Sequence, residues 1–258
     1  MAASRAGRAV AWAVQRRALA RWGRRAARAD SAPLSELRRQ AAEAQALRAA
    51  LERLLLEAGT RLALPRIGAE AAVLPAGTDW HWRPPFWRGP FPGTGLAAVE
   101  SQTRLGDGLA VFHDCRDSAL TLRQLRNRSE DDLAPFALRL DVLDFDGSFL
   151  SLALDLPPES CAGLQKRHLV RLELALETER PLEIFARLNI RHGPNVEQQV
   201  HELPARSGRV AVEFDLAYTR LNEKRVEAAW LDLIFDRPAM NQIVLSDLVL
   251  ARYPRAEV

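Results

Sequence analysis

The sequence contains two short stretches whose side chains could begin a metal site or a nucleophilic pair. In the first, HDC at 113–115, the spacing places His113 and Cys115 on one face of an extended strand. Imidazole and thiolate can ligate zinc or act together in catalysis, but both roles need further partners that the sequence does not supply. We interpret the pair as a core cysteine beside a hydrogen-bonded histidine. We predict no metal site, no cofactor and no catalytic residue.

The second stretch, DFDG at 144–147, begins like a calcium-binding loop. The twelfth position of such a loop requires a glutamate, whereas that position here is Asp155, and the residues before it read as a strand. We interpret Asp146 and Gly147 as a hairpin turn, because glycine tolerates a positive φ. The sequence has no glycine-rich phosphate loop, nucleophile elbow or zinc-protease signature. The motifs of the sequence therefore indicate no particular reaction.

Polar residues that alternate with apolar ones offer a binding surface instead. They lie on three predicted strands, with Arg187, Asn189 and Arg191 on the first, Glu213 and Asp215 on the second, and Trp230 and Asp232 on the third. If these strands share a sheet, one face presents the planar polar groups and the aromatic ring that sugar recognition uses. The residues of the first and third strands are our candidate carbohydrate-binding residues. The alternative is a solvated face with cross-strand ion pairs.

An aromatic run, WHWRPPFWRGPF at 80–91, holds three tryptophans and two phenylalanines, and is broken by three prolines and a glycine. The prolines keep the segment extended, so it cannot bury its own rings, and five exposed aromatic rings would form an adhesive patch. We therefore predict a strap laid against the edge or one end of the main domain, with Trp82 and Trp87 largely buried. A ligand platform formed by one of the rings is the alternative.

The elements that must position these residues are mostly strands. From Leu96 onward the apolar residues recur with a period of two, over 136–142, 170–176, 184–190, 210–216 and 231–235. Turn signals separate these segments, at 144–148, 156–160, 192–195 and 205–208. About ten such segments with no convincing helix between them predict a mainly β protein, an antiparallel β-sandwich of the jelly-roll type.

The N-terminal part is predicted to be an α-helical hairpin. Alanine and arginine dominate residues 3–28, and both favour helix. The stretch DSAP at 30–33 breaks this helix and starts a second one, which shows a heptad of apolar residues over 34–58 and should end at Gly59. A short coiled coil or self-association through residues 34–58 fits this pattern. The predicted domains are 1–59 for the helical appendage, 60–95 for the strap or linker, and 96–258 for the sandwich.

Charge is concentrated in this N-terminal part. Residues 1–29 hold eight arginines and no acidic residue, and residues 1–59 carry a net charge of +7 within a chain of +3. Three anionic partners come into question: acidic phospholipid, nucleic acid and the acidic remainder of a chain. We favour the phospholipid surface and select Arg16, Arg17, Arg21, Arg24 and Arg25 as contacts. Nucleic acid is disfavoured, because 34 of the 36 basic residues are arginines, a bias typical of a GC-rich genome.

The two cysteines, Cys115 and Cys161, are too few for a disulfide framework and fit a reducing compartment, although one bridge between them stays open. No stretch reaches the roughly 20 apolar residues of a membrane-spanning helix. The N-terminus is rich in arginine like a mitochondrial transit peptide, but lacks the apolar core and cleavage site of a secretory signal. We expect a cytoplasmic protein, peripheral to the inner membrane.

Five stretches together resemble a known family: DWHWRPPFWRGP, VFHDCRDSALTLRQLRNRSEDDLAPF, FDGSFLSLALDLP, LEIFARLNIRHGPNVEQ and EFDLAYTRLNEKRVEAAWLDLIF. From about Asp79 to the C-terminus the chain is similar to a family of unknown function from alphaproteobacteria, found in Rhodobacter-like bacteria. The resemblance implies a bacterial source, in which the transit-peptide pattern has no meaning, and nothing catalytic.

These observations lead to one function hypothesis and two alternatives. We expect a non-catalytic binding module that recognises a glycan or polysaccharide on one sheet face, with a basic N-terminal helix for peripheral attachment. The first alternative is a scaffold or protein-interaction protein without a small-molecule ligand, and the second is an enzyme whose site is scattered over loops. A cleft lined by Arg187, Asn189 and Trp230 would favour the binding module, and a flat or convex face the scaffold.

Overall fold

The computed structural model describes residues 5–63, 74–91, 95–106, 108–116, 119–129, 131–204 and 208–255. The chain forms two compact units, residues 1–54 and residues 55–258. Residues 205–207 of the predicted turn at 205–208 and parts of the predicted strap lie outside the described residues. The first unit is helical, and the second contains all the strands that the structure describes.

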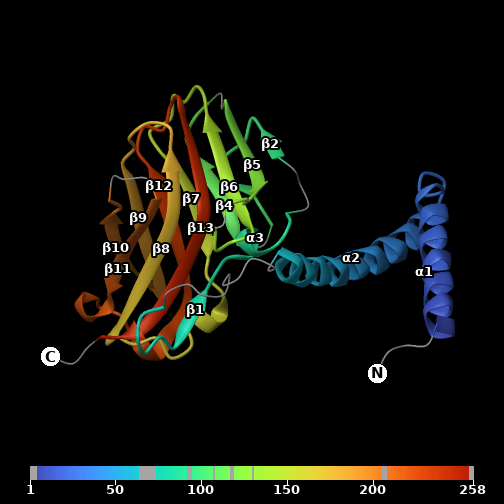
Figure 1. The fold of residues 1–258 in the computed structure, drawn as a ribbon, viewed down its shortest axis with the longest axis horizontal. Coiled ribbons are helices and arrows are strands. Elements are labelled where there is room, and N and C mark those ends of the chain that lie inside the picture. Colours follow the sequence, from blue (N-terminus) through green and yellow to red (C-terminus); the bar gives the residue numbers. More distant parts are fainter. Residues whose placement is uncertain are drawn as a thin grey trace. The chain divides into compact units, whose positions relative to one another are not determined.

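The larger unit is a sandwich of two antiparallel sheets, which confirms the predicted fold (Figure 1). The first sheet has the order β11-β8-β13-β6-β5-β2, and β1 pairs with β13 beside this path. Its strands are β11 (Gly208–Asp215), β8 (His168–Thr178), β13 (Asn241–Pro254), β6 (Phe136–Val142), β5 (Leu120–Arg126), β2 (Gly95–Ala97) and β1 (Trp80–Trp82).

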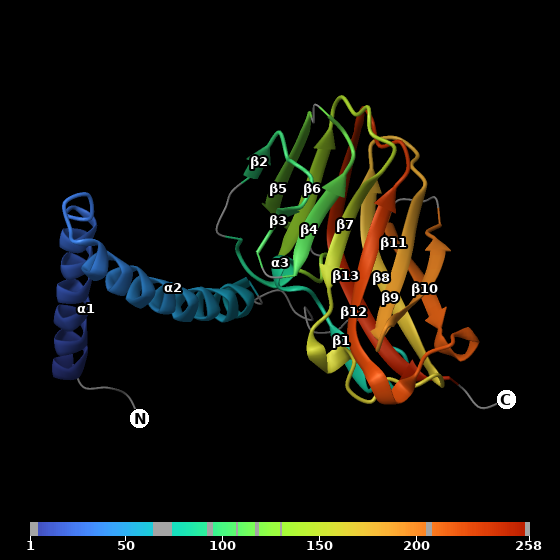
Figure 2. The same ribbon diagram turned by 180° about the vertical axis from the view of Figure 1, so that it is seen from behind.

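The second sheet forms the other layer and is seen in front in Figure 2. Its order is β10-β9-β12-β7-β4-β3. Its strands are β10 (Asn195–Glu202), β9 (Ile184–His192), β12 (Val226–Phe235), β7 (Leu150–Asp155), β4 (Leu109–His113) and β3 (Thr103–Arg104). Short 3-10 turns follow β7 (η1, Pro158–Ser160) and β11 (η2, Leu216–Tyr218) and precede β12 (η3, Glu223–Arg225).

The period of two in the sequence is what builds the core between the sheets. Every second residue of β8 from His168 to Leu176 is buried, and the residues between are half-buried. Because successive side chains of a strand point to opposite faces, one set packs inward and the other meets solvent. The inward sets of both sheets form one continuous hydrophobic cluster.

The prediction that Asp146 and Gly147 form a hairpin turn is wrong. Asp146 and Gly147 do not close a hairpin, because β6 and β7 lie in different sheets and residues 143–149 cross between them. Gly147 is also not among the glycines with positive φ. Glycine is needed for space instead: a Cβ there would lie 2.6 Å from Oδ1 of Asp114 and 2.8 Å from the backbone nitrogen of Cys115. The predicted turn at 192–195, by contrast, joins β9 to β10, with Gly193 at φ +60°.

The N-terminal segment forms the two predicted helices, α1 (Arg5–Ala26) and α2 (Leu34–Ala63). Gly59 does not end the second helix, which continues to Ala63. A glycine inside a helix costs only about 1 kcal/mol relative to alanine, so it does not stop the helix by itself. The predicted division at residues 59 and 95 stays a prediction.

The aromatic run adds a strand to the first sheet and is more regular than the predicted strap. Strand β13 pairs with β6 through Asn241–Leu245 and with β1 through Leu250–Arg252. The neighbour of β13 on this side therefore changes from β6 to β1 along the strand. The short helix α3 (Pro85–Arg88) follows directly. The segment is therefore held by backbone pairing as well as by its rings.

Trp87 is the anchor of this segment. It is fully buried, as predicted, and its Nε1 donates a hydrogen bond of 2.9 Å to the carbonyl of Leu245. That carbonyl borders a bulge in β13 between Leu245 and Asp247, where the regular ladder is interrupted. Trp82 packs on the core but is only half-buried, so the prediction for this ring holds in part.

Polar contacts fix the rest of the segment. Arg83 forms a bidentate pair with the buried Asp247, with Nε 2.7 Å from Oδ1 and Nη2 3.0 Å from Oδ2. The amide of Gln124 on β5 donates to the carbonyls of Phe86 and Gly89 and accepts from the backbone nitrogen of Phe91. These bonds use the backbone groups that α3 is too short to satisfy by itself.

We predict that Trp87→Ala lowers the free energy of unfolding by about 3–5 kcal/mol, because it removes a large core ring and leaves a cavity. Trp87→Phe keeps a ring but loses the donor to Leu245, and should cost less. The measurement is urea unfolding followed by circular dichroism. Trp12→Ala on the exposed face of α1 is the control, and a Trp87→Ala protein as stable as this control would contradict the prediction.

Candidate functional site

The candidate site is the outer face of the second sheet. Strand β12 pairs with β9 so that Trp230 lies opposite Asn189 and Asp232 opposite Arg187. Arg191 lies one step further along β9, opposite Ala228. The five residues selected from the sequence thus share one face, as the prediction required. Glu213 and Asp215 do not join them, since β11 belongs to the first sheet.

A hydrogen-bonded network connects four side chains on this face. Oδ2 of Asp232 accepts from Nε and Nη2 of Arg187, both at 2.9 Å, and from Nδ2 of Asn189 at 2.9 Å. Oδ1 of Asn189 accepts from Nε2 of Gln198 at 3.0 Å. Carboxylate and guanidinium make the strong, charge-assisted bonds of the network. The network therefore fixes the position of Arg187 and Gln198 on the face.

Burial divides the five residues into two groups. Asn189 has no exposed surface and Asp232 is 5% exposed, so neither can contact a large ligand. Trp230 is half-buried on the outer side, since its neighbours Ala229 and Leu231 fill the core. The side chains of Arg187 and Arg191 are 37% and 53% exposed. Trp230 and the two arginines are thus the accessible part, and Asn189 and Asp232 support it from below.

Other residues of this face were missed by the sequence analysis. Asp155 lies opposite Trp230 on β7, with a side chain that is 68% exposed. Phe185, Ile234 and Phe112 form a neighbouring row on this face and are half-buried. In the strand register, Phe185 and Ser151 lie opposite Ile234, and Phe112 lies opposite Ser151. The face therefore combines aromatic and aliphatic surface with charged groups.

The outer face of the first sheet matches the ion-pair alternative. Arg171 pairs with Glu213 at 2.9 Å, and Arg209 pairs with Glu173 at 3.2 Å, both across neighbouring strands. The hydroxyl of Tyr253 donates to Glu213 at 2.7 Å, and burial followed by this bond raises the pKa of Tyr253 to about 12. Exposed pairs of this kind contribute little to stability individually. The candidate face also has cross-strand ion pairs, between Arg187 and Asp232 at 2.9 Å and between Arg191 and Glu227 at 3.5 Å, so ion pairs alone do not distinguish the two faces.

The HDC stretch has a structural role. The ring of His113 is buried and its Nε2 lies 2.8 Å from the carbonyl of Val99. The thiol of Cys115 is half-buried and donates to Oδ1 of Asp146 at 2.8 Å. Burial, and then this hydrogen bond, raises the pKa of the Cys115 thiol above its ordinary value. In this structure the thiol of Cys115 therefore serves as a hydrogen-bond donor that links residues 114–116 to the loop of Asp146.

The neighbouring carboxylates hold loops together. Asp114 accepts hydrogen bonds from the backbone nitrogen and hydroxyl of Ser148 and from the backbone nitrogen of Phe149. Within the described residues there is no group of three or more histidine, cysteine or acidic side chains that could hold a metal ion. Cys115 and Cys161 are free thiols in this structure.

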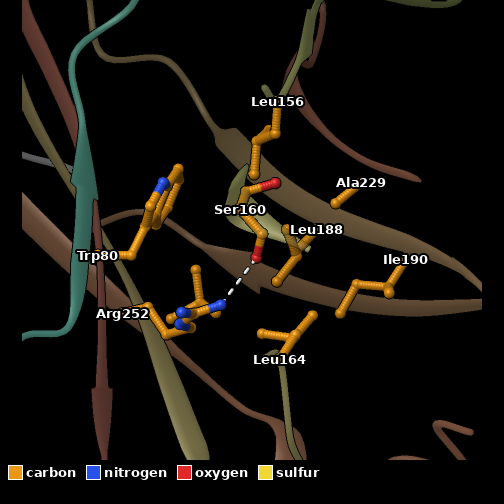
Figure 3. Close-up of a pocket in the computed structure, with 9 residues that line it drawn as sticks. Trp80, Leu156, Ser160, Leu164, Leu188, Ile190, Ala229 and Arg252 are labelled. Carbon is orange, nitrogen blue, oxygen red and sulfur yellow. Dashed lines mark hydrogen bonds between the residues drawn. The ribbon is translucent and has the colours of Figure 1, made fainter. Parts of the chain in front are cut away.

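An apolar hollow lies between the sheets at one end of the sandwich (Figure 3). It is lined by Trp80, Leu156, Ser160, Leu164, Val170, Leu188, Ile190, Ala229 and Arg252. Its volume of about 10 Å³ has room for about one water molecule. Nη1 of Arg252 donates to the carbonyls of Ser160 and Ala162, and its Nε donates to Asp79. The hollow is part of the packing of β1 and holds no larger ligand.

The arginines selected in α1 have different surroundings. The guanidinium of Arg16 lies 4.8 Å from the ring centre of Trp12, and that of Arg25 lies 4.7 Å from the ring centre of Trp22. Arg25 also forms an ion pair of 2.8 Å with Glu43. Arg21 and Arg24 border a hollow between the two helices. Among the described residues, no helix has the length and apolar character needed to cross a membrane.

We predict that Asn189→Ala lowers the free energy of unfolding by about 1–3 kcal/mol, because Asp232 and Gln198 lose a partner in a buried network. Arg191→Ala, on the same strand but exposed, should change it by no more than about 0.5 kcal/mol. Urea unfolding of the two variants beside the unmodified protein measures this. Equal stability of both variants would show that the network does not support the face.

Comparison with protein families shows one family of unknown function over the whole chain, and the alphaproteobacterial source stays a prediction. A family model described as "Family of unknown function (DUF6478)" matches residues 1–258, so the helices share in the family pattern as well as the sandwich. No curated protein matches the sequence.

Several solved structures are similar in fold at low identity. A family 11 carbohydrate-binding module from Clostridium thermocellum, in complex with a mixed-linked tetrasaccharide, is 9% identical with a TM-score of 0.39, and the match covers 64% of this chain and 97% of that one. A xylan-binding domain of Xyn10C from Paenibacillus barcinonensis is 9% identical with a TM-score of 0.37, covering 63% and 94%.

The third similar structure is the enzymatically active domain of tailspike protein 4 from bacteriophage CBA120. It is 8% identical with a TM-score of 0.41, and the match covers 60% of this chain but only 21% of that one. These likenesses concern the general fold, and no ligand or activity follows from them.

Proposed function

The chain belongs to the family of unknown function DUF6478, and on the chemistry of its surface we propose that it is a non-catalytic module that binds a carbohydrate. The proposed site is the outer face of the second sheet, around Trp230. The observation that carries the proposal is the outward ring of Trp230, which lies between strands bearing Arg187, Arg191 and Asp155.

The chemistry of sugars explains why this arrangement is favoured. A pyranose ring has an apolar C–H side that packs on an indole, and hydroxyl groups at its edge that bond with planar donors and acceptors. The side chains of Arg191 and Asp155 are more than half exposed. Within the described part of the chain, Nη1 of Arg187 has no hydrogen-bond partner. Donors and an acceptor therefore surround the ring.

The buried network below supports binding. Arg187 is already held by Asp232, and Gln198 by Asn189. A side chain that is fixed before the ligand arrives loses less conformational entropy when the ligand binds. The named solved structures include modules that bind a tetrasaccharide or xylan, but at these scores they add no weight, and the proposal depends on the face itself.

We predict that Trp230→Ala lowers affinity for a bound polysaccharide at least about tenfold while the fold stays intact, because the ring supplies the stacking surface. A glycan array identifies the ligand, and isothermal titration calorimetry measures the affinity. Tyr253→Phe, on the outer face of the first sheet, is the matched aromatic control and should bind as the unmodified protein does. An array without any bound glycan would remove the proposal.

A scaffold function is the second candidate, and the exposed leucines of α2 favour it. Leu47, Leu51, Leu54 and Leu55 are 43–63% exposed. A leucine stripe of this kind is typical of helices that associate with another helix. Under this alternative the sandwich carries no small-molecule ligand, and the array would be negative.

We further propose that α1 attaches the protein to the anionic inner face of a bacterial cytoplasmic membrane. Eight arginines in residues 1–29 have no acidic neighbour in that segment. Trp12 and Leu19, seven residues apart, are 62% and 64% exposed, and Arg16 lies between them on the same side of the helix. Exposed rings and aliphatic groups flanked by arginine are typical of helices that lie in the membrane interface.

We predict that the full chain co-sediments with phosphatidylglycerol vesicles at low salt and that a version starting at Leu34 does not. Each basic residue near an anionic surface contributes about 1 kcal/mol, and salt screens this attraction. Phosphatidylcholine vesicles are the control and should bind neither protein. If both versions bind equally, or neither binds, the membrane has no place in the function.

A further inference from the structure

The N-terminal unit contains a hollow of about 380 Å³ between its two helices. The residues that line it come from the end of α1, the connecting turn and the start of α2: Arg21, Arg24, Arg25, Arg28, Ser31, Ala32, Glu36 and Gln40. Small-molecule sites have volumes of about 300–1,000 Å³. The hollow is therefore large enough for a phosphorylated ligand.

Most of the positive charge around this hollow is not neutralised. Arg25 is paired with Glu43. Within the described part of the chain, the guanidinium groups of Arg21, Arg24 and Arg28 have neither a hydrogen bond nor an ion pair. Glu36 is the single acidic residue of the lining, and it accepts a hydrogen bond from Gln40. Three guanidinium groups thus border one hollow without a partner.

The dipole of α1 accounts for only part of this arrangement. Arg24 and Arg25 lie in the last turn, where the helix carries a negative partial charge of about half an electron. That charge stabilises cations at the helix end, but it cannot compensate the mutual repulsion of Arg21, Arg24 and Arg28. An anion in the hollow would relieve this repulsion.

The guanidinium groups also indicate which anion fits. Each offers a planar fork of N–H donors that matches two oxygens of a phosphate, and such charge-assisted pairs are the strongest hydrogen bonds of proteins. We propose that the hollow between α1 and α2 binds a phosphate-bearing anion, either a soluble polyphosphate or the headgroup of an anionic lipid. This deepens the proposed attachment of α1 and is independent of the carbohydrate face.

The test uses the full chain with two probes and two variants of equal charge. The probes are inorganic tripolyphosphate, measured by calorimetry, and phosphatidylglycerol vesicles, measured by co-sedimentation. The first variant, Arg21→Gln with Arg24→Gln and Arg28→Gln, removes the unpaired arginines of the hollow. The control, Arg38→Gln with Arg39→Gln and Arg53→Gln, removes three arginines of α2 that do not line it. Glutamine has nearly the helix propensity of arginine, and circular dichroism checks that the helices remain.

We expect the hollow variant to lose at least about tenfold in affinity for one of the probes and the control variant to lose less than about twofold. Loss for tripolyphosphate identifies a soluble ligand, and loss for the vesicles alone identifies a lipid headgroup. Equal losses in both variants would show a general effect of charge and overturn the proposal, as would a full chain that binds neither probe. Vesicle binding that survives in the hollow variant, but not in the version starting at Leu34, would reject the hollow and keep the attachment.

Discussion

The sandwich depends on a change of partner along one strand. Over its 14 residues β13 pairs with β8 on one side, while on the other side β6 is followed by β1. The bulge between Leu245 and Asp247 lies at this change of partner. Two residues of the aromatic run bind the polar groups beside the bulge: Trp87 donates a hydrogen bond to the carbonyl of Leu245, and Arg83 forms an ion pair with the buried Asp247. A buried carbonyl and a buried carboxylate without partners would cost several kcal/mol. The aromatic run is thus needed to complete the first sheet.

The two outer faces of the sandwich differ in how their polar side chains are arranged, although the same alternation of polar and apolar residues produces both. On the first sheet the polar side chains form ion pairs across strands and remain partly exposed to solvent. On the second sheet the polar network is buried beneath accessible groups, with Asn189 closed to solvent and the ring of Trp230 outside. A buried polar network has to be fully satisfied to be stable, and it then holds its neighbours rigidly. This difference in rigidity is the reason why we propose the second face, and not the first, as the binding surface.

The sequence predicts those parts that depend on local patterns. Alternation predicts strands and their inward residues, and the turn signal at 192–195 predicts the break between β9 and β10. That Gln198 lies opposite Asn189 across this turn was not predicted and follows from the observed register. The sequence does not predict that β12 lies beside β9, since that pairing joins residues some forty positions apart. The role of Gly147 was misread for the same reason: the atoms that exclude a side chain there belong to Asp114 and Cys115, on another loop. Burial of Asn189 likewise depends on neighbours from two other strands.

The anchoring of Trp87 also constrains when the protein can fold. Its hydrogen-bond partner Leu245 follows 158 residues later in the chain, and Asp247, the partner of Arg83, follows 164 residues after it. At a synthesis rate of about 5–20 residues per second, a ribosome needs on the order of ten to thirty seconds to travel that distance. During this time the aromatic run has emerged without the strand that receives it. The first sheet can close only after Leu245 and Asp247 have been synthesised, so until then the tryptophans of the nascent chain lack the strand that buries them.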